Sequence, residues 1–237
     1  MTIQPQHIKP TGGRIAEAVL TSGDPERLKE LSKLLDNVKV INTYRYVVYT
    51  GEYRGTPVSL MSHGIGAPSL AIAVEEAHAF GANKIIRLGT CGGLQTGQTY
   101  GDVVIPNSAS SDPGGTIGVY ASGINLAPAP DFGLTSALIK GFSKTGIRYH
   151  VGPVFSADAF YAESKYAPEL ARMNFVGIEM ECAALFMLGQ IRGFKTASAL
   201  MVVDNQNEKL PFMPVEEMHK IAKETGRIVL DVLAGAE

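Results

Sequence analysis

Residues 177–186 read Gly-Ile-Glu-Met-Glu-Cys-Ala-Ala-Leu-Phe, the pattern of a buried strand that runs directly into a helix. Glu179 and Glu181 lie two residues apart in this segment. Alternate residues of an extended chain point to the same side, so we expect both carboxylates on one side and Ile178 and Met180 on the other. Burying an ionised carboxylate is costly unless a partner compensates its charge. Two interpretations are open: one acid caps the following helix, or the acids bind hydroxyl groups of a small molecule.

Strand-like and helix-like segments alternate along the rest of the chain, which predicts an α/β fold with helices on the faces of a sheet. No internal repeat, linker or composition change divides the chain, so we expect a single domain, residues 1–237. The polarity pattern predicts strands at 17–21, 45–50, 57–62, 102–110, 149–155 and 195–203, and helices from residue 25 and at 70–80, 132–146 and 214–233. Residues 112–131, rich in Gly, Pro and Ala, are predicted to form a surface or lid loop.

The composition argues against several classes of function. A formal net charge of −2 provides no electrostatic basis for binding nucleic acid or an anionic membrane. The two cysteines cannot form a disulfide framework, and neither they nor the five scattered histidines have metal-ligand spacing, so no metal site is expected. No signal pattern is present, and no apolar run approaches the roughly 20 residues of a membrane span. We therefore expect a soluble, cytoplasmic protein.

The first predicted strand is followed by a turn that suits an anion. Gly23 lies in this turn, Asp24 is a plausible helix N-cap, and Pro25 fits the first helical position. Such a turn presents free backbone N–H groups and the positive end of a helix dipole. Arg27 in the first helical turn is electrostatically unfavourable unless an anion lies nearby. The combination predicts an anion site.

A similar arrangement recurs at residues 84–93, where a buried strand is predicted to end in a glycine-rich loop that contains Thr90. Arg87 lies inside the apolar part of this strand, and a buried arginine usually has an anionic partner, which can be a protein carboxylate or a ligand. Gly64 and Gly66, after an earlier strand, permit either a close approach to a ligand or a plain tight turn.

Two further segments point to a ligand with an aromatic part. Phe160 and Tyr161 are consecutive in a loop, so at least one ring is available for stacking, although core packing is the alternative for the other. Asp204 ends the last core strand, which is where open α/β sheets bind ligands. Burial would raise its pKa towards neutral pH and let it act as an acid. An anion site, a carboxylate for sugar hydroxyls and a stacking ring together describe nucleoside phosphorolysis.

The chain also resembles the hexameric purine nucleoside phosphorylase and uridine phosphorylase family, especially archaeal 5′-methylthioadenosine and purine nucleoside phosphorylases. The resemblance covers nearly the whole chain, and its most specific motifs are residues 23–27 (Gly-Asp-Pro-Glu-Arg), 87–92 (Arg-Leu-Gly-Thr-Cys-Gly), 155–161 (Phe-Ser-Ala-Asp-Ala-Phe-Tyr) and 179–181 (Glu-Met-Glu). It implies a three-layer α/β/α fold with a central mixed, twisted and partly barrel-like sheet. It also implies a homohexamer, a trimer of dimers with shared active sites, and inorganic phosphate as co-substrate without any cofactor.

Roles for individual residues follow from the resemblance alone. It implies that phosphate is bound by Gly23, Arg27, Arg87 and Thr90, with Arg45 reaching the site of a neighbouring subunit. It implies that the nucleoside is bound by His7, Ile65, Cys91, Gly92, Phe160, Ile178, Glu179, Met180 and Glu181. Among these, Glu181 would hold the ribose 2′ and 3′ hydroxyls, Met180 would lie beneath the sugar, and His7 would approach the 5′ position across the dimer interface. Asp204 would protonate N7 of a purine as the glycosidic bond breaks.

The base preference is expected to be purine, with 5′-methylthioadenosine among the candidate substrates, because members that act on uridine usually carry Asn in place of Asp204. Two departures from the purine pattern are present: Val203 stands where many purine enzymes have Ser, and residues 205–214 lack the Arg that assists the acid in bacterial enzymes. Water or Asn205 is the expected substitute.

Three alternative functions remain open. The nearest is a uridine phosphorylase on the same scaffold. A nucleosidase, which uses water, would not need the guanidiniums of Arg27, Arg45 and Arg87. A nucleoside-binding protein without chemistry would not need an acid such as Asp204 over the base.

Overall fold

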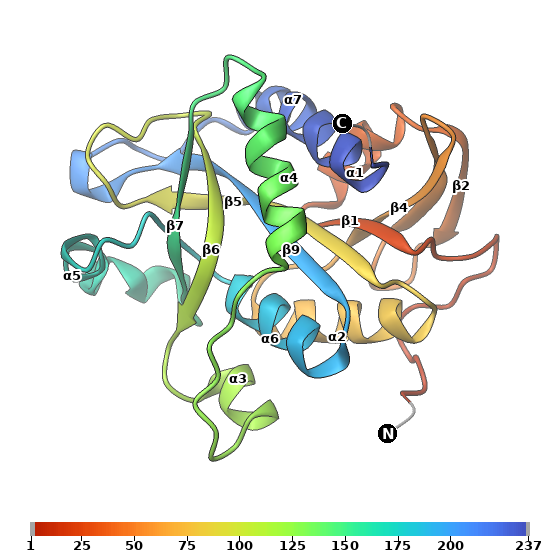
Figure 1. Ribbon diagram of the computed structural model, residues 1–237, viewed down its shortest axis with the longest axis horizontal. Helices are drawn as coiled ribbons and strands as arrows, with labels where there is room; N and C mark the ends of the chain where they lie inside the picture. Colours follow the sequence, from red (N-terminus) through yellow and green to blue (C-terminus); the bar gives the residue numbers. More distant parts are fainter. Residues whose placement is uncertain (1–2, 236–237) are drawn as a thin grey trace.

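A nine-stranded mixed sheet organises the protein, in the strand order β2-β3-β4-β1-β5-β8-β7-β6-β9 (Figure 1). The computed structural model describes residues 3–235, apart from the side chains of Ser164 and Gln206. The strands are β1 (Ala18–Ser22), β2 (Asp36–Asn42), β3 (Val48–Tyr53), β4 (Thr56–Ser62), β5 (Lys84–Gly93), β6 (Val103–Ser111), β7 (Tyr149–Ser156), β8 (Gly177–Glu179) and β9 (Lys195–Asp204).

Part of this sheet closes on itself. Strand β5 pairs in parallel with β1 on one side and with β9 on the other, and its last two residues pair with β8. Since β9 also pairs with β6, the strands β5, β8, β7, β6 and β9 form a ring. The prediction of a mixed, partly barrel-like sheet is therefore confirmed.

The helices form a layer on each face of the sheet, as predicted. In Figure 1, α1, α4 and α7 lie on one face and α2, α3 and α6 on the other, while α5 lies at the side of β7. The helices are α1 (Pro25–Ser32), α2 (Ala67–Ala79), α3 (Gly115–Tyr120), α4 (Phe132–Ser143), α5 (Ala167–Arg172), α6 (Cys182–Arg192) and α7 (Val215–Leu233), with 3₁₀ segments η1 (Phe160–Lys165) and η2 (Gln206–Glu208).

The two faces of the sheet build two separate cores because consecutive strand residues point in opposite directions. In β5, Ile85 packs into the core beneath α2 and α6, whereas Ile86 packs into the core beneath α1, α4 and α7. Val19 and Leu20 of β1 divide in the same way. Each such side chain is fully buried and contributes roughly 1.5–3 kcal/mol.

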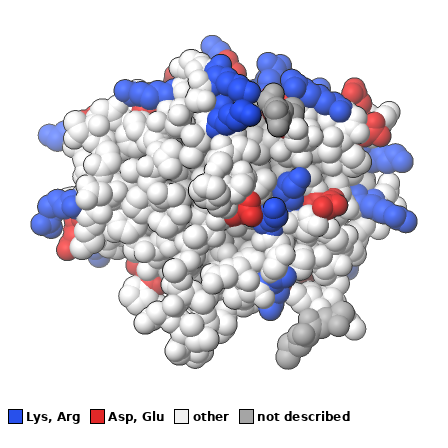
Figure 2. Space-filling model, viewed as in Figure 1, with Lys and Arg blue, Asp and Glu red and all other residues white. Residues whose placement is uncertain are grey.

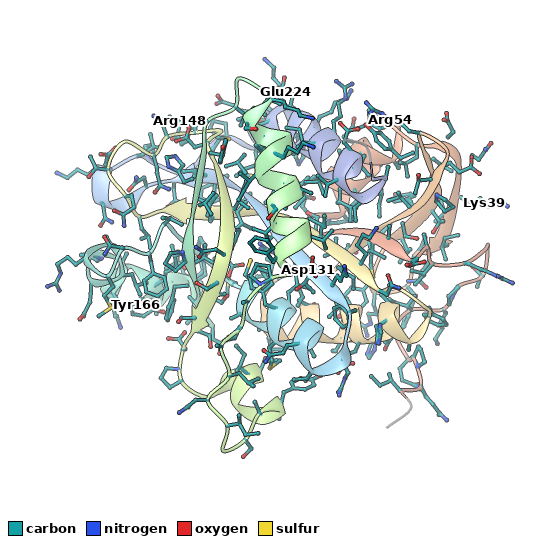
Figure 3. The ribbon with its side chains drawn as sticks, in the orientation of Figure 1. Lys39, Arg54, Asp131, Arg148, Tyr166 and Glu224 are labelled. Carbon is teal, nitrogen blue, oxygen red and sulfur yellow. The ribbon has the colours of Figure 1, made fainter. Side chains whose placement is uncertain are left out.

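Local sequence signals explain how several helices begin. Asp24 caps α1 by accepting a hydrogen bond from the N–H of Glu26, and Pro25 takes the first position, as predicted. Asp131, at the start of α4 in Figure 3, accepts a hydrogen bond of 2.8 Å from the N–H of Leu134. The β3–β4 turn is tied to α7 where Arg54 lies 3.2 Å from the carboxylate of Asp231 (Figure 3).

The structure differs from the sequence-based prediction in a few elements. Strand β5 continues through its glycines to Gly93, because Gly92 and Gly93 pair with β8 instead of forming a loop. The predicted loop 112–131 contains the short helix α3. Strand β2 was not predicted, since five of its seven residues are exposed and its polarity does not alternate.

Figure 2 shows the surface in the orientation of Figure 1. Many Lys and Arg side chains lie along its upper edge, interspersed with acids, whereas the area over β6 and β7 carries few charges. Within residues 3–235, no helix is both long and apolar enough to cross a membrane.

Candidate active site

A cavity of about 730 Å³ opens where the carboxyl ends of several strands meet. Strands β1, β4, β5 and β9 run parallel, so their carboxyl ends lie at the same edge of the sheet. This is where ligand sites of α/β sheets are found. Its wall includes thirteen of the fifteen residues predicted for the site: Gly23, Arg27, Ile65, Arg87, Thr90, Cys91, Gly92, Phe160, Ile178, Glu179, Met180, Glu181 and Asp204.

The other two predicted residues, His7 and Arg45, line a second cavity of about 500 Å³. The two cavities share Gly23, Pro25 and Gly64 in their walls, so they adjoin along the turn after β1. His7 is held there by Glu76 of α2, whose carboxylate lies 2.8 Å from His7 Nδ1. Within one subunit, His7 and Arg45 are therefore next to the main cavity but do not line it.

Arg87 is buried at the base of the main cavity between two carboxylates. Its Nη1 lies 3.2 Å from Glu179, and its Nη2 donates a hydrogen bond to Glu181. The guanidinium folds back over Gly89, where an added Cβ would collide with Nη1. Burial alone would lower the pKa of Arg87, but the carboxylates of Glu181 and Glu179 outweigh it and raise the pKa, so the group stays charged. Its partners in the protein are thus these two acids.

Arg27 is equally buried but lacks such a partner. Its Nη1 donates to the hydroxyl of Ser22 at 2.9 Å and to the carbonyl of Leu88 at 3.2 Å. No carboxylate of the described side chains comes within 4 Å of its guanidinium. Burial lowers the pKa of Arg27 to about 10; Asp24 opposes that shift and the charge of Arg87 adds to it. A buried cation in this state favours the binding of an anion.

Unsatisfied buried nitrogens gather beside these arginines. In the described part of the chain, the buried side-chain nitrogens without a hydrogen-bond partner are Nε of Arg27, Nε of Arg87 and both ring nitrogens of His63. Burial lowers the pKa of His63 to about 3, so its ring is neutral. Native proteins leave few such groups unpaired, and clusters of them are typical of sites that bind a ligand or water.

Glu179 and Glu181 have different hydrogen-bond partners. Glu179 caps α6: its carboxylate accepts hydrogen bonds from the N–H groups of Glu181 at 2.9 Å and Cys182 at 3.0 Å, and from the hydroxyl of Ser156. Glu181 instead accepts a hydrogen bond of 2.6 Å from the N–H of Gly66 across the cavity wall. Burial raises the pKa of Glu181, but Arg87 outweighs it and the pKa is lowered, so Glu181 stays ionised.

Asp204 lies at the end of β9 with its carboxyl group against the backbone of Gly92. An added Cβ on Gly92 would lie 3.1 Å from Asp204 Oδ1 and 3.1 Å from Ile178 Cγ2, so a side chain here would make tight contacts with both residues. Burial raises the pKa of Asp204. The carboxyl group makes no hydrogen bond to any described side chain or backbone group, so it is free to contact a ligand in the cavity.

The prediction that Asn205 assists this acid does not fit the structure. The amide nitrogen of Asn205 donates to the carbonyls of Gln95 at 3.0 Å and Gln98 at 3.4 Å, and its oxygen accepts from the N–H of Asn207. Its hydrogen-bonding groups are occupied in holding the turn after β9.

The aromatic pair differs from the expectation that one ring packs in the core. Phe160 is 48% exposed and Tyr161 is 97% exposed, and the rings meet edge to face with centroids 5.2 Å apart. Both rings lie on the cavity wall, so both are available to a ligand.

Several cavity residues were missed by sequence reasoning, notably Glu163, Val203 and Phe212. Glu163 follows the aromatic pair in η1 and is 5% exposed. An acid two residues after the aromatic pair was the available signal. Burial raises the pKa of Glu163 to about 7, with further contributions from Asp204 and Glu179.

Comparison with known proteins gives consistent results. The family model described as "Phosphorylase superfamily" matches residues 17–234. The chain is 36% identical to a DeoD-type purine nucleoside phosphorylase of Limosilactobacillus reuteri over 201 residues, covering 84% of this chain and 85% of the relative. It is 38% identical to the DeoD-type enzyme of Listeria welshimeri over 202 residues, covering 84% and 86%.

Among solved structures, uridine phosphorylase from Vibrio fischeri ES114 in complex with 6-hydroxy-1-naphthoic acid superposes with a TM-score of 0.83 at 28% identity. The match covers 93% of this chain and 92% of the other. A second structure of the same enzyme has the same TM-score and identity.

Proposed function

The chain belongs to the Phosphorylase superfamily, and we propose that it is a purine nucleoside phosphorylase, a pentosyltransferase that releases a free purine and ribose 1-phosphate or deoxyribose 1-phosphate. The family resemblance inferred from the sequence motifs is confirmed by these matches. The purine assignment is favoured because the purine enzymes are 36–38% identical to this chain, whereas the matched uridine enzyme is 28% identical.

The observation that carries this proposal is the buried Arg27 without a carboxylate partner, in the same cavity as Asp204. Phosphate would satisfy the charge of Arg27 and reach the N–H groups at the turn after β1, with Thr90 nearby on the wall. Arg87 would position Glu181, and Glu181 would accept hydrogen bonds from the ribose hydroxyls.

The proposed reaction forms a bond between a phosphate oxygen and C1′ as the bond from C1′ to the purine nitrogen breaks. Positive charge develops on the sugar, and phosphate beneath it lowers the barrier. The electron pair of the broken bond passes to the base, which accepts a proton at N7 from Asp204 and leaves neutral. Burial raises the pKa of Asp204, which favours the protonated acid needed for this step.

The test is release of free base from inosine, adenosine, 5′-methylthioadenosine and uridine, each with and without phosphate. We expect phosphate-dependent cleavage of the purine nucleosides and poor cleavage of uridine. Phosphate-dependent cleavage of uridine alone would favour the alternative uridine phosphorylase, and cleavage without phosphate would contradict the role of Arg27.

We further propose that the active enzyme is an oligomer, a hexamer, in which Arg45 and His7 serve the site of a neighbouring subunit. Support comes from their position in the adjoining cavity and from apolar residues exposed near the two cavities, such as Ile65 at 77% and Phe212 at 54%. The two cysteines are buried free thiols, which suits a reducing cytoplasmic compartment.

Mixing inactive variants tests the shared site. Asp204→Ala and Arg45→Ala subunits should each be impaired alone, and a refolded mixture should regain activity because some sites then combine an intact Asp204 with an intact Arg45. An unchanged sum of the two activities, or a monomer in analytical ultracentrifugation, would contradict the shared site.

A further inference from the structure

Glu163 is a buried acid on the cavity wall that the proposed reaction does not use. It lies in η1, between the exposed aromatic pair and α5, and only 5% of its surface is exposed. No hydrogen bond or ion pair joins its carboxyl group to a described side chain or backbone group. Glu163 and Asp204 line the same cavity. The oxygens of the Glu163 carboxyl group are not among the enclosed polar atoms that lack a partner, so they remain accessible from the cavity. An accessible carboxyl group without partners in the described part of the protein can bind a ligand.

The neighbours of Glu163 favour its neutral form. Burial raises the pKa of its carboxyl group to about 7, and the negative charges of Asp204 and Glu179 act in the same direction. A neutral carboxyl group is both a donor and an acceptor of hydrogen bonds, and its proton can reside on either oxygen. An ionised carboxylate can only accept.

We propose that Glu163 is a specificity-determining residue that binds the 6-substituent of the purine base. This inference rests on the proposed function, in which Asp204 protonates N7. In a purine, N7 and the 6-substituent are neighbouring polar groups on one edge of the ring system. A base that presents N7 to Asp204 therefore presents its 6-amino or 6-oxo group to the adjoining wall.

Much of the wall around the base is apolar. Ile178, Val203 and Phe160 can pack against the ring but not bind its polar edge. Polar side chains on this wall include Thr90 and Tyr161, and Glu163 adds an acid to which the proposed reaction gives no role. Its hydroxyl can donate to a 6-oxo group, and its carbonyl can accept from a 6-amino group, so the substrate class includes both kinds of purine nucleoside.

The experiment compares kcat/KM for adenosine, inosine and purine riboside, which carries only hydrogen at position 6. For Glu163→Ala we expect a loss of about 10- to 100-fold on adenosine and inosine, the usual range for a lost hydrogen bond in a substrate pocket, and a loss below about 2-fold on purine riboside. Glu163→Gln, whose amide also donates and accepts, should keep most activity on both substituted purines. The KM for phosphate should be unchanged in both variants.

The outcomes separate this inference from the proposed function. Wild-type enzyme that cleaves the purine nucleosides, with Glu163→Ala affecting all three equally or none, would overturn the role of Glu163 and leave the proposed function intact. Wild-type protein that cleaves no purine nucleoside in phosphate would overturn both. A thermal unfolding curve of each variant shows whether an equal loss on all substrates reflects misfolding, in which case Glu163 has a structural role and the inference is wrong.

Discussion

Arg87 and Glu179 form a buried ion pair, with Nη1 3.2 Å from the carboxylate, and the same carboxylate caps α6. Glu179 thus holds both the guanidinium of Arg87 and the first residues of α6 in place. Glu179→Ala would leave the charge of Arg87 partly uncompensated and remove the cap. We expect a loss of about 3–5 kcal/mol in the free energy of unfolding, measured by urea denaturation. A loss below about 1 kcal/mol would contradict this role.

Glu181 should behave differently from Glu179. In Glu181→Gln, the amide oxygen can still accept a hydrogen bond from the N–H of Gly66, so the fold should be retained. The variant loses the charge that pairs with Arg87 and that, in the proposed function, binds the ribose hydroxyls. We expect kcat/KM to fall by about 10- to 100-fold while the unfolding midpoint changes less than in Glu179→Ala. Equal kinetic effects in the two variants would contradict the division of roles.

Arg27 should make the thermal stability of the protein depend on phosphate concentration. Phosphate that binds only the folded state stabilises it by about 2.7 kcal/mol at 100 times the Kd, so Tm should rise with phosphate concentration. Arg27→Met should abolish this rise. Lys29→Met is the matched control, because Lys29 is an exposed cation on the same helix and should leave the response intact. A phosphate response that survives in Arg27→Met would place the anion elsewhere.

Asp204→Asn should lower kcat on purine nucleosides by about 10²- to 10⁴-fold, the usual contribution of a general acid, while affinity for the free base is retained. In the wild type, the acid must be protonated, so kcat should fall as pH rises through the pKa of Asp204, which burial places above its ordinary value of 3.8. A pH–rate profile of both forms checks this. If kcat of Asp204→Asn falls with rising pH in the same way as kcat of the wild type, another group is the acid.

Glu163 should make stability depend on pH. Its pKa is raised from 4.5 to about 7 in the folded state, so between these values the folded protein holds a proton that the unfolded chain has lost. Stability should therefore be greatest below about pH 4.5 for this group and decrease as pH rises to about 7. In Glu163→Gln, this part of the pH dependence should vanish. Urea denaturation of both forms between pH 5 and about 8 measures the difference.

Strand-end motifs predicted part of the cavity, because parallel strands bring residues distant in sequence to one edge, and the family resemblance supplied the rest. Gly23, Thr90 and Asp204 lie at or near the end of a recognisable strand, and all three line the cavity. Pairing across the sheet could not be predicted from the sequence. Whether the partner of Arg87 was a ligand or a protein acid depended on β8 approaching β5 at Gly92, which no local pattern indicates.

Glu163 shows a second limit of prediction from the sequence. Its burial depends on the 3₁₀ segment η1 folding over the end of the sheet, and short irregular segments have no periodicity to reveal it. Strand β2 was missed because it lies at the edge of the sheet, where most of its residues are exposed and do not show the apolar pattern of a buried strand. Local patterns therefore predicted the elements with an alternating or amphipathic face, and missed those whose environment is set by distant parts of the chain.

The pairing of β5 with β9 also has a consequence for folding during synthesis on the ribosome. Lys84 of β5 pairs with Lys195 of β9, and the ring of strands cannot close until β9 has left the exit tunnel. Contacts between such distant segments are slow to form because a long loop must first be ordered. Until then, β5, which carries Arg87, and the end of β9, which carries Asp204, stay apart. We therefore expect a nascent chain to be inactive until synthesis is almost complete. A chain truncated before β9 would have an unpaired edge at β5, which favours aggregation.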